Sequence, residues 1–195
     1  KIYKQENKYN GNELEYVLKV LDSEDQDRKE TPFVQRLENL ATEVFQSKYA
    51  IAHNSGTSTL HTSLIAAGVK PGDEVISPAH TVIMNSFVTL HQKALPVYVD
   101  IDPDTFNMCP DDLERKITNK TKAIQVVHMH GNPSDMERIM DIANHYNIPV
   151  IEDSAQCVLS KINGKLVGTF GDIASWSFEN KKHLSAGEGG MVTTD

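Results

Sequence analysis

The sequence predicts an α/β fold, a three-layer sandwich whose central sheet is mainly parallel. Short apolar runs rich in Val, Ile and Ala alternate along most of the 195 residues with segments whose apolar residues recur at helical spacing. Glycine- and proline-bearing turns separate many of these segments. Because a strand, a helix and a further strand in succession normally leave the two strands parallel, we expect helices on both faces of the sheet.

The composition argues against several classes of function. Hydrophobic residues make up 39% and charged residues 24% of the chain, as in an ordinary globular domain. The formal net charge of −8 disfavours binding to nucleic acid or to an anionic membrane surface. No apolar run reaches membrane-spanning length, and the polar start shows no signal peptide. Cys109 and Cys157 are too few for a disulfide framework, so we expect a cytoplasmic protein.

The N-terminal segment, residues 1–30, is expected to stand apart from the main domain, residues 31–195. Apolar residues within 12–21 recur at helical spacing and predict a short amphipathic helix. The charged stretch 22–30 contains no core-forming residue and is interpreted as an exposed loop. The main domain should open with a helix near Thr31 and Pro32, because threonine caps helices well and proline suits the first turn.

The first strand of the main domain, residues 49–53, leads through residues 54–57 into a helix. A strand, a glycine-bearing turn and a helix together present free backbone N–H groups and the positive end of a helix dipole to an anion. The turn therefore predicts a phosphate site around Gly56. The alternative is ordinary helix capping by Ser55 or Thr57.

Strands are also predicted at residues 74–77 and 94–99, the second followed by a run of alternating acids from Asp100 to Asp104. Alternating acids are found in calcium loops, but the glycine and the distal glutamate of an EF-hand are absent. We therefore interpret the acids as a turn that precedes a helix starting near Pro110.

Two further strands, residues 122–127 and 148–151, end in polar residues. His128 and His130 follow the first, and they are either a pair of metal ligands or histidines at a strand end near the pocket. A helix is expected from Asp135. Asp153 follows the second strand, where parallel sheets bind ligands, although capping of a helix is an equal alternative on local grounds.

The end of the chain, residues 175–194, predicts two strands flanking a turn that carries Lys182. The glycine-punctuated stretch 161–171 is expected to form a hairpin or loop before it. A lysine on such a turn can form a Schiff base with a carbonyl if neighbours and partial burial lower its pKa. On local grounds, a pair such as Lys181 and Lys182 is more often a solvated pair in a hairpin loop.

Five motifs in fixed order favour the chemical interpretation. The sequence around Lys182 resembles the Schiff-base lysine signature of the DegT/DnrJ/EryC1/StrS family of pyridoxal-phosphate (PLP) sugar aminotransferases, which have fold type I. The similarity extends over almost the whole chain. The motifs are Asn54–Thr57, Pro71–Val75, Asp100–Pro103, Glu152–Gln156, and Ser177-Phe178 with Lys182 and Gly187–Gly190.

This resemblance implies PLP as cofactor and assigns residues to it. Lys182 would form the internal Schiff base and then act as acid and base. Asp153 would hold the proton on the pyridine nitrogen, and Gln156 would lie near the phenolic oxygen. Gly56 and Thr57, beside Ser55, would hold the phosphate together with the hydroxyl of Ser177. No metal is expected.

One position departs from the common family pattern. Many members place an aromatic residue, which stacks on the pyridine ring, where this chain has Val82. Valine can pack against the ring but supplies no π-stacking. His80 is either the stacking residue or a polar residue at the start of a helix.

The resemblance also implies an activity and an assembly. The expected reaction moves an amino group from L-glutamate to a keto group on a nucleotide-linked sugar, in amino-sugar biosynthesis, and members are usually homodimers with active sites at the interface. Members also carry a smaller C-terminal domain that this chain lacks. Two alternatives remain: a sugar 3-dehydratase, which has histidine where the lysine stands, and a catalytically silent fragment. The motif register puts Lys182, not His183, at that position.

Overall fold

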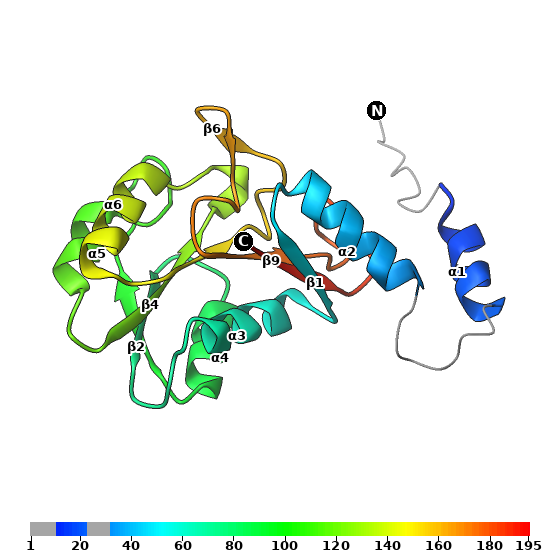
Figure 1. Cartoon of the computed structure of the whole chain (residues 1–195). Coiled ribbons are helices and arrows are strands. Elements are labelled where there is room, and N and C mark those ends of the chain that lie inside the picture. Colours follow the sequence, from blue (N-terminus) through cyan, green and yellow to red (C-terminus); the bar gives the residue numbers. More distant parts are fainter. Residues whose placement is uncertain (1–10, 23–31) are drawn as a thin grey trace, which may run out of the picture. The chain divides into compact units, whose positions relative to one another are not determined.

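The computed structural model describes residues 11–22 and 32–195 (Figure 1). These residues belong to two compact units, and the division falls between Leu37 and Glu38, inside a helix. The predicted domain boundary between residues 30 and 31 stays a prediction. None of the described helices is both long and apolar enough to cross a membrane.

The N-terminal unit contains helix α1 (Glu13–Asp22) and the first turns of helix α2 (Pro32–Val44). The helix expected over residues 12–21 is thus confirmed, and α2 begins at the predicted proline. Tyr16 and Phe33 meet edge to face, with their ring centroids 5.8 Å apart. The predicted loop from Asp22 to Glu30 lies outside the described residues, apart from Asp22, which ends α1.

The second unit is built on a seven-stranded sheet with strand order β1-β9-β8-β5-β4-β2-β3. The strands are β1 (Tyr49–His53), β2 (Glu74–Pro78), β3 (Leu95–Val99), β4 (Thr121–Val127), β5 (Val150–Asp153), β8 (Ile173–Ser177) and β9 (Gly190–Thr194). All neighbouring pairs are parallel except those that β9 makes with β1 and β8. A separate antiparallel pair, β6 (Lys161–Ile162) and β7 (Lys165–Leu166), forms the expected hairpin. The mainly parallel sheet predicted from the sequence is confirmed.

Helices cover both faces of the sheet, because successive strand residues point to opposite sides. In this unit the helices that follow α2 are α3 (Gly56–Ala66), α4 (Met84–His91), the 3-10 turn η1 (Met129–Gly131), α5 (Pro110–Lys116) and α6 (Met136–Tyr146). Val75 on β2 packs in one core with α3 and α4, whereas the next residue, Ile76, packs with α5 and α6. Ala41 of α2 shares a core with Trp176, and Phe45, directly after α2, stacks on the Trp176 ring. The three layers are therefore as predicted.

One strand boundary was predicted wrongly. The strand expected at residues 148–151 begins two residues later and extends through Glu152 and Asp153. Both carboxylates are buried, and each accepts hydrogen bonds from neighbouring groups, so that two acids can occupy the end of an interior strand.

The topology brings seven chain segments to a single edge of the sheet. The parallel strands β2, β3, β4, β5 and β8 end at this edge, and β1 ends there too because both it and β8 are antiparallel to β9. Strand β9 starts at the same edge. Ligands of parallel sheets bind beyond the carboxyl ends of the strands, so this edge is where a site is expected.

Candidate active site

A cavity of about 210 Å³ opens at this edge of the sheet. Seven of the nine predicted site residues line it, and they come from four separate parts of the chain. They are Ser55, Gly56, Thr57, Val82, Asp153, Ser177 and Lys182, and the lining is completed by Leu60, Met84, Ala155, Glu179 and Glu188. The fold therefore brings most of the predicted residues into one place.

One wall of the cavity is the N-terminus of α3, directly after β1. Ser55 caps the helix: its Oγ accepts from the N–H of Ser58 at 3.1 Å, and the Ser58 hydroxyl accepts from the N–H of Ser55 at 3.2 Å. Within the described part of the chain, no group accepts from the N–H groups of Gly56 and Thr57. Two free donors at the positive end of a helix suit a phosphate. Capping and anion binding are compatible here, because they use different N–H groups.

The end of β8 lies against this helix N-terminus. A Cβ atom on Gly56 would stand 2.7 Å from the Cβ and 2.9 Å from the Oγ of Ser177, so only glycine allows this approach. A buried hydrogen bond of 2.7 Å between the hydroxyls of Thr59 and Ser175 holds α3 and β8 together one turn deeper. The Ser177 hydroxyl therefore lies beside the first turn of α3, where it can add a third donor for an anion.

Replacing Gly56 with alanine is expected to separate these two elements. The added methyl group overlaps Ser177, so the substitution should lower the free energy of unfolding by about 1–3 kcal/mol. It should also weaken the binding of inorganic phosphate and of PLP, which thermal-shift titration measures. Gly11→Ala is the matched control, because its Cβ meets nothing closer than 3.4 Å. Unchanged stability and phosphate affinity in Gly56→Ala would contradict this account.

Asp153 lies at the bottom of the cavity, on the α3–α4 side of β5. Its Oδ2 accepts from the Nδ2 of Asn85 at 3.1 Å, and its Oδ1 accepts from the N–H of Ala155 at 3.1 Å. Burial raises the pKa of the Asp153 carboxyl, while Asn85, Ala155 and the charge of Lys182 act in the opposite direction. Asn85 was not predicted from the sequence, because it lies far from Asp153 in the chain and belongs to no motif.

The neighbouring acid, Glu152, points to the other face of the sheet and has a different task. Its carboxylate accepts from the Nε2 of His128 (3.1 Å) and from backbone N–H groups of Gly168, Phe170 and Gly171 (2.8, 2.7 and 2.6 Å). Burial opposes the ionisation of Glu152, but His128 and these N–H groups outweigh it and lower its pKa. Glu152 thus fixes the loop before β8. The alternation of strand side chains could have separated the two acids in advance.

The two histidines after β4 do not form a pair. His128 is buried, and its Nδ1 accepts from the N–H of Ser134 at 3.1 Å, which leaves the proton on the Nε2 that donates to Glu152. His130 is exposed and lies in a different hollow. Among the described residues, no three His, Cys, Asp or Glu side chains stand together as metal ligands would. The acidic run after β3 forms the expected turn, in which Asp102 accepts from two backbone N–H groups at 2.9 Å.

Lys182 stands on the loop between the antiparallel strands β8 and β9, as predicted. Backbone hydrogen bonds of 2.9 Å close this loop, from Phe178 N–H to the Gly189 carbonyl and from Lys182 N–H to the Glu179 carbonyl. Lys182 is half-buried and lines the cavity, whereas His183 is exposed and does not. The geometry thus agrees with the motif register that puts Lys182 at the reactive position.

A second hollow, of about 440 Å³, shares Lys182, Glu179 and Ala155 with the cavity. The predicted residue Gln156 lines this hollow and not the cavity itself. His80 lines neither: it is exposed, its ring lies 6.2 Å from the rings of Phe106 and His130, and it precedes the start of α4 by four residues. The stacking role of His80 stays a prediction. Val82 is the residue of that segment which reaches the cavity.

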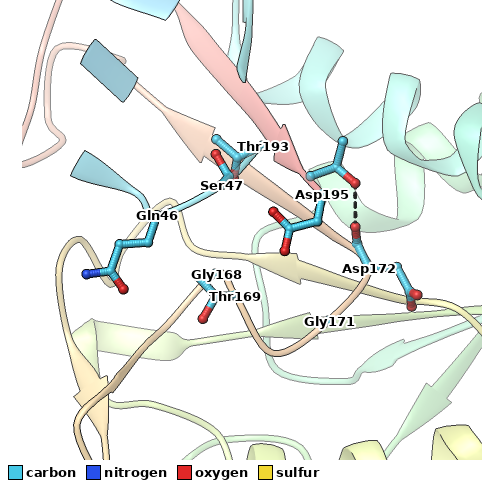
Figure 2. A pocket seen from close by; sticks show the side chains of 9 residues that line it. Gln46, Ser47, Gly168, Thr169, Gly171, Asp172, Thr193 and Asp195 are labelled. Atoms are coloured by element: carbon cyan, nitrogen blue, oxygen red, sulfur yellow. Dashed lines mark hydrogen bonds between the residues drawn. The ribbon is translucent and has the colours of Figure 1, made fainter. Parts of the chain in front are cut away.

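Another hollow, of about 220 Å³, lies at the opposite edge of the sheet, before β8 and after β9 (Figure 2). Its lining includes Asp172, whose carbonyl accepts from the Oγ1 of Thr194 at 2.7 Å, and Gly168 and Gly171 of the loop held by Glu152. None of the predicted site residues lines it. This hollow is therefore separate from the predicted site.

A mainly parallel α/β sheet with a lysine loop, a buried aspartate and a free helix N-terminus at its carboxyl edge defines the large domain of a fold-type-I PLP-dependent enzyme. The sequence profile of the DegT/DnrJ/EryC1/StrS aminotransferase family matches residues 7–195. The chain belongs to this family, whose aminotransferases use PLP.

Among curated relatives, the chain is 45% identical over 185 residues to GDP-perosamine synthase of Escherichia coli O157:H7. The alignment covers 95% of this chain and 50% of that protein, so the chain spans about half the length of the relative.

Solved structures agree with this assignment. An aminotransferase from Psychrobacter cryohalolentis superimposes with a TM-score of 0.90 at 38% identity, covering 95% of this chain and 47% of that one. NtdA from Bacillus subtilis, with bound cofactor PMP, gives 0.84 at 36% identity, covering 95% and 42%. A mutant of the GDP-4-keto-6-deoxymannose-3-dehydratase ColD, with bound GDP-perosamine, gives 0.87 at 28% identity, covering 96% and 50%.

Proposed function

We propose that this chain is the cofactor-binding part of a PLP-dependent aminotransferase that moves an amino group from L-glutamate to a keto group of a nucleotide-linked sugar. The observation that carries the proposal is the meeting of Lys182, Asp153 and the N-terminus of α3 in one cavity. Its relative GDP-perosamine synthase supports a nucleotide-linked sugar as the acceptor.

The cavity fits the three chemical ends of PLP. The free N–H groups of Gly56 and Thr57, with the Ser177 hydroxyl, match the phosphate. The buried acceptor Asp153 matches a protonated ring nitrogen, and the amine of Lys182 matches the aldehyde carbon. When bound, PLP supplies an electron-withdrawing ring that stabilises negative charge at the carbon next to the reacting nitrogen.

Each residue then has a defined task. Lys182 would hold the cofactor covalently and, once an amino acid takes its place, would take a proton from the donor Cα and pass it to C4′ of the cofactor. Asp153 would hold the proton on the ring nitrogen, and its hydrogen bonds to Asn85 and Ala155 fix the carboxylate for this. Val82 would offer an aliphatic contact to the ring in place of an aromatic stack. Glu188 borders the cavity from the loop, where it is exposed.

The dehydratase alternative has a structural neighbour in its favour, since ColD shares the fold. The cavity argues against it, because the side chain that reaches the cavity from the loop is Lys182 and not the neighbouring histidine, His183. A lysine there supports covalent attachment of the cofactor and hence transamination.

The experiment that tests the proposal begins with an absorption spectrum of the purified protein with PLP, before and after L-glutamate. Borohydride reduction and peptide mapping follow. We expect a reducible bond, with the label on Lys182, and a spectrum that L-glutamate changes. No label, or a label on another lysine, would contradict the proposal and favour the dehydratase or a catalytically silent chain.

We further propose that two copies of the chain associate through α3 and α4, as a cytoplasmic homodimer with its active sites near the interface. These helices pack on each other and leave large apolar side chains about half exposed: Ile65 54%, Ile83 56%, Phe87 47% and Leu90 54%. A hollow of about 270 Å³ that Phe87 lines also includes Ser55 and Thr57, next to the proposed phosphate site.

A dimer is expected in light scattering coupled to gel filtration, and Phe87→Glu should shift it toward monomer by placing a charge in the interface. Tyr146→Glu is the control, since this exposed ring on α6 lies on the other side of the sheet. A monomeric wild-type protein, or a dimer that Phe87→Glu leaves intact, would refute this interface.

A further inference from the structure

The second hollow beside Lys182 is unusually rich in groups that can carry positive charge. Its lining includes Lys181, Lys182, His130 and His183, against a single acid, Glu179. The chain as a whole has a formal net charge of −8, so this concentration runs against the overall balance. An anionic ligand would be attracted to this hollow more than to most of the surface.

The contacts within the hollow leave Lys181 available to such a ligand. The carboxylate of Glu179 accepts from the backbone N–H of Lys181 at 3.1 Å and so is directed toward the loop backbone. Within the described residues, the ammonium group of Lys181 forms no ion pair with a carboxylate. Lys181 is exposed and lies within the turn that the Lys182 N–H closes onto the Glu179 carbonyl.

The opposite wall of the hollow is held in an unusual backbone conformation. His130 has φ 55° and ψ 22°, the left-handed region that side chains other than glycine seldom adopt. The Oε1 of Gln156 accepts from its N–H at 3.1 Å and anchors this conformation. Strained backbone of this kind is concentrated at functional sites, and here it brings an imidazole to the hollow that borders Lys182.

The position of the hollow selects the kind of anion. The α-carboxylate of an amino acid is one bond from the carbon that reacts, so it must lie next to Lys182. The diphosphate of a nucleotide-linked sugar is separated from the reacting keto carbon by part of the sugar ring and by the glycosidic bond. A hollow that shares Lys182 with the cavity therefore fits the carboxylate.

We propose that this hollow is the binding site for the α-carboxylate of the amino donor and that Lys181 binds it. This inference rests on the proposed aminotransferase function. Lys181 is a binding residue in it, and the proton transfers remain with Lys182. A charge-assisted hydrogen bond at a partly open site has a strength that corresponds to about a tenfold change in affinity.

The test is Lys181→Ala, with Lys161→Ala as the control that removes an equally exposed lysine from the β6–β7 hairpin. Calorimetry on cofactor-free protein measures the affinity for glutarate, a dicarboxylate without an amine, and separately the affinity for GDP. We expect Lys181→Ala to weaken glutarate binding about tenfold and to leave GDP binding unchanged. With PLP bound, the L-glutamate concentration for half-maximal rate should rise by the same factor at an unchanged maximal rate.

Unchanged glutarate affinity in Lys181→Ala would overturn the inference. A loss of affinity for GDP alone would also overturn it, because it would show that the hollow binds the diphosphate. An equal loss of glutarate affinity in Lys161→Ala would show that the effect comes only from the change in net charge, and this would also overturn the inference. The measurement on cofactor-free protein is independent of the borohydride label on Lys182. A missing label with a tenfold glutarate loss would therefore refute the proposed function and retain the anion site.

Discussion

Lys182→Ala is expected to abolish the reducible covalent link between the protein and PLP. The cofactor should still bind, because the N-terminus of α3 and Asp153 do not depend on this side chain. Transamination should fall by about 10⁴-fold or more, since both the covalent attachment and the proton carrier at the donor Cα are lost. Borohydride reduction followed by mass spectrometry measures the link, and single-turnover kinetics with L-glutamate measure the transfer.

Lys181→Ala is the matched control for the covalent link. It removes the same charge from the adjacent position, yet the borohydride label should persist, because Lys182 and not Lys181 lines the cavity. A full label in Lys182→Ala would move the attachment to another lysine and refute the assignment.

Lys182→Ala has a second consequence, for the pKa of Asp153. The positive charge of Lys182 lowers the pKa of Asp153, so its removal should raise that pKa further.

Much of this fold could be predicted from the sequence, because buried parallel strands are continuous apolar runs that leave little ambiguity. Strand β4 is such a run, with Ala123 on one face, Ile124 on the other, and both buried. The end of β5 was predicted wrongly because this strand ends in charged residues and not in apolar ones. Glu152 and Asp153 look like loop residues, and only their distant hydrogen-bond partners make them acceptable inside a strand.

The site was predictable where a single segment carries the chemistry and unpredictable where contacts join distant segments. The loop of Lys182 and the cap at Ser55 are local features, and the structure has both as expected. Asn85 beside Asp153 depends on the packing of α4 against β5, which no local pattern encodes. Ser177 beside Gly56 was expected only from the family resemblance, because the two residues lie far apart in the sequence. His80 and Val82 illustrate the same limit, since the path of an irregular segment decides which of two nearby residues reaches a cavity.

Asp153→Asn is expected to keep the covalent link to Lys182 and to lose most of the amino exchange. An amide has no negative charge with which to hold a proton on the ring nitrogen, so transamination should fall by about 10³-fold. The label on Lys182 should form as in the wild type. Asp104→Asn, the same change at an exposed position of the turn after β3, is the control and should leave the rate unchanged. Unchanged exchange in Asp153→Asn would remove Asp153 from this role.

The same substitution should stabilise the protein without cofactor, and the sign follows from the pKa of Asp153. Burial raises that pKa in the folded state above the ordinary value of 3.8, so the folded state binds the proton more tightly than the unfolded chain. The free energy of unfolding therefore decreases as the pH rises from 3.8 through the raised pKa of folded Asp153, and it stays lower at higher pH. At neutral pH, Asp153→Asn removes this cost. Its melting temperature should exceed that of the wild type, and the difference should shrink as the pH falls toward 3.8.

The local contacts can accept an amide at position 153. The Oδ1 of Asn85 is buried without a hydrogen-bond partner in the described structure, and rotation of that amide would let it accept from the new side chain. The Ala155 N–H keeps its acceptor. A variant that is more stable yet nearly inactive would identify Asp153 as a charge kept for catalysis at the expense of folding, as expected for an active-site group. A variant that is less stable at neutral pH would show instead that the carboxylate holds the fold together.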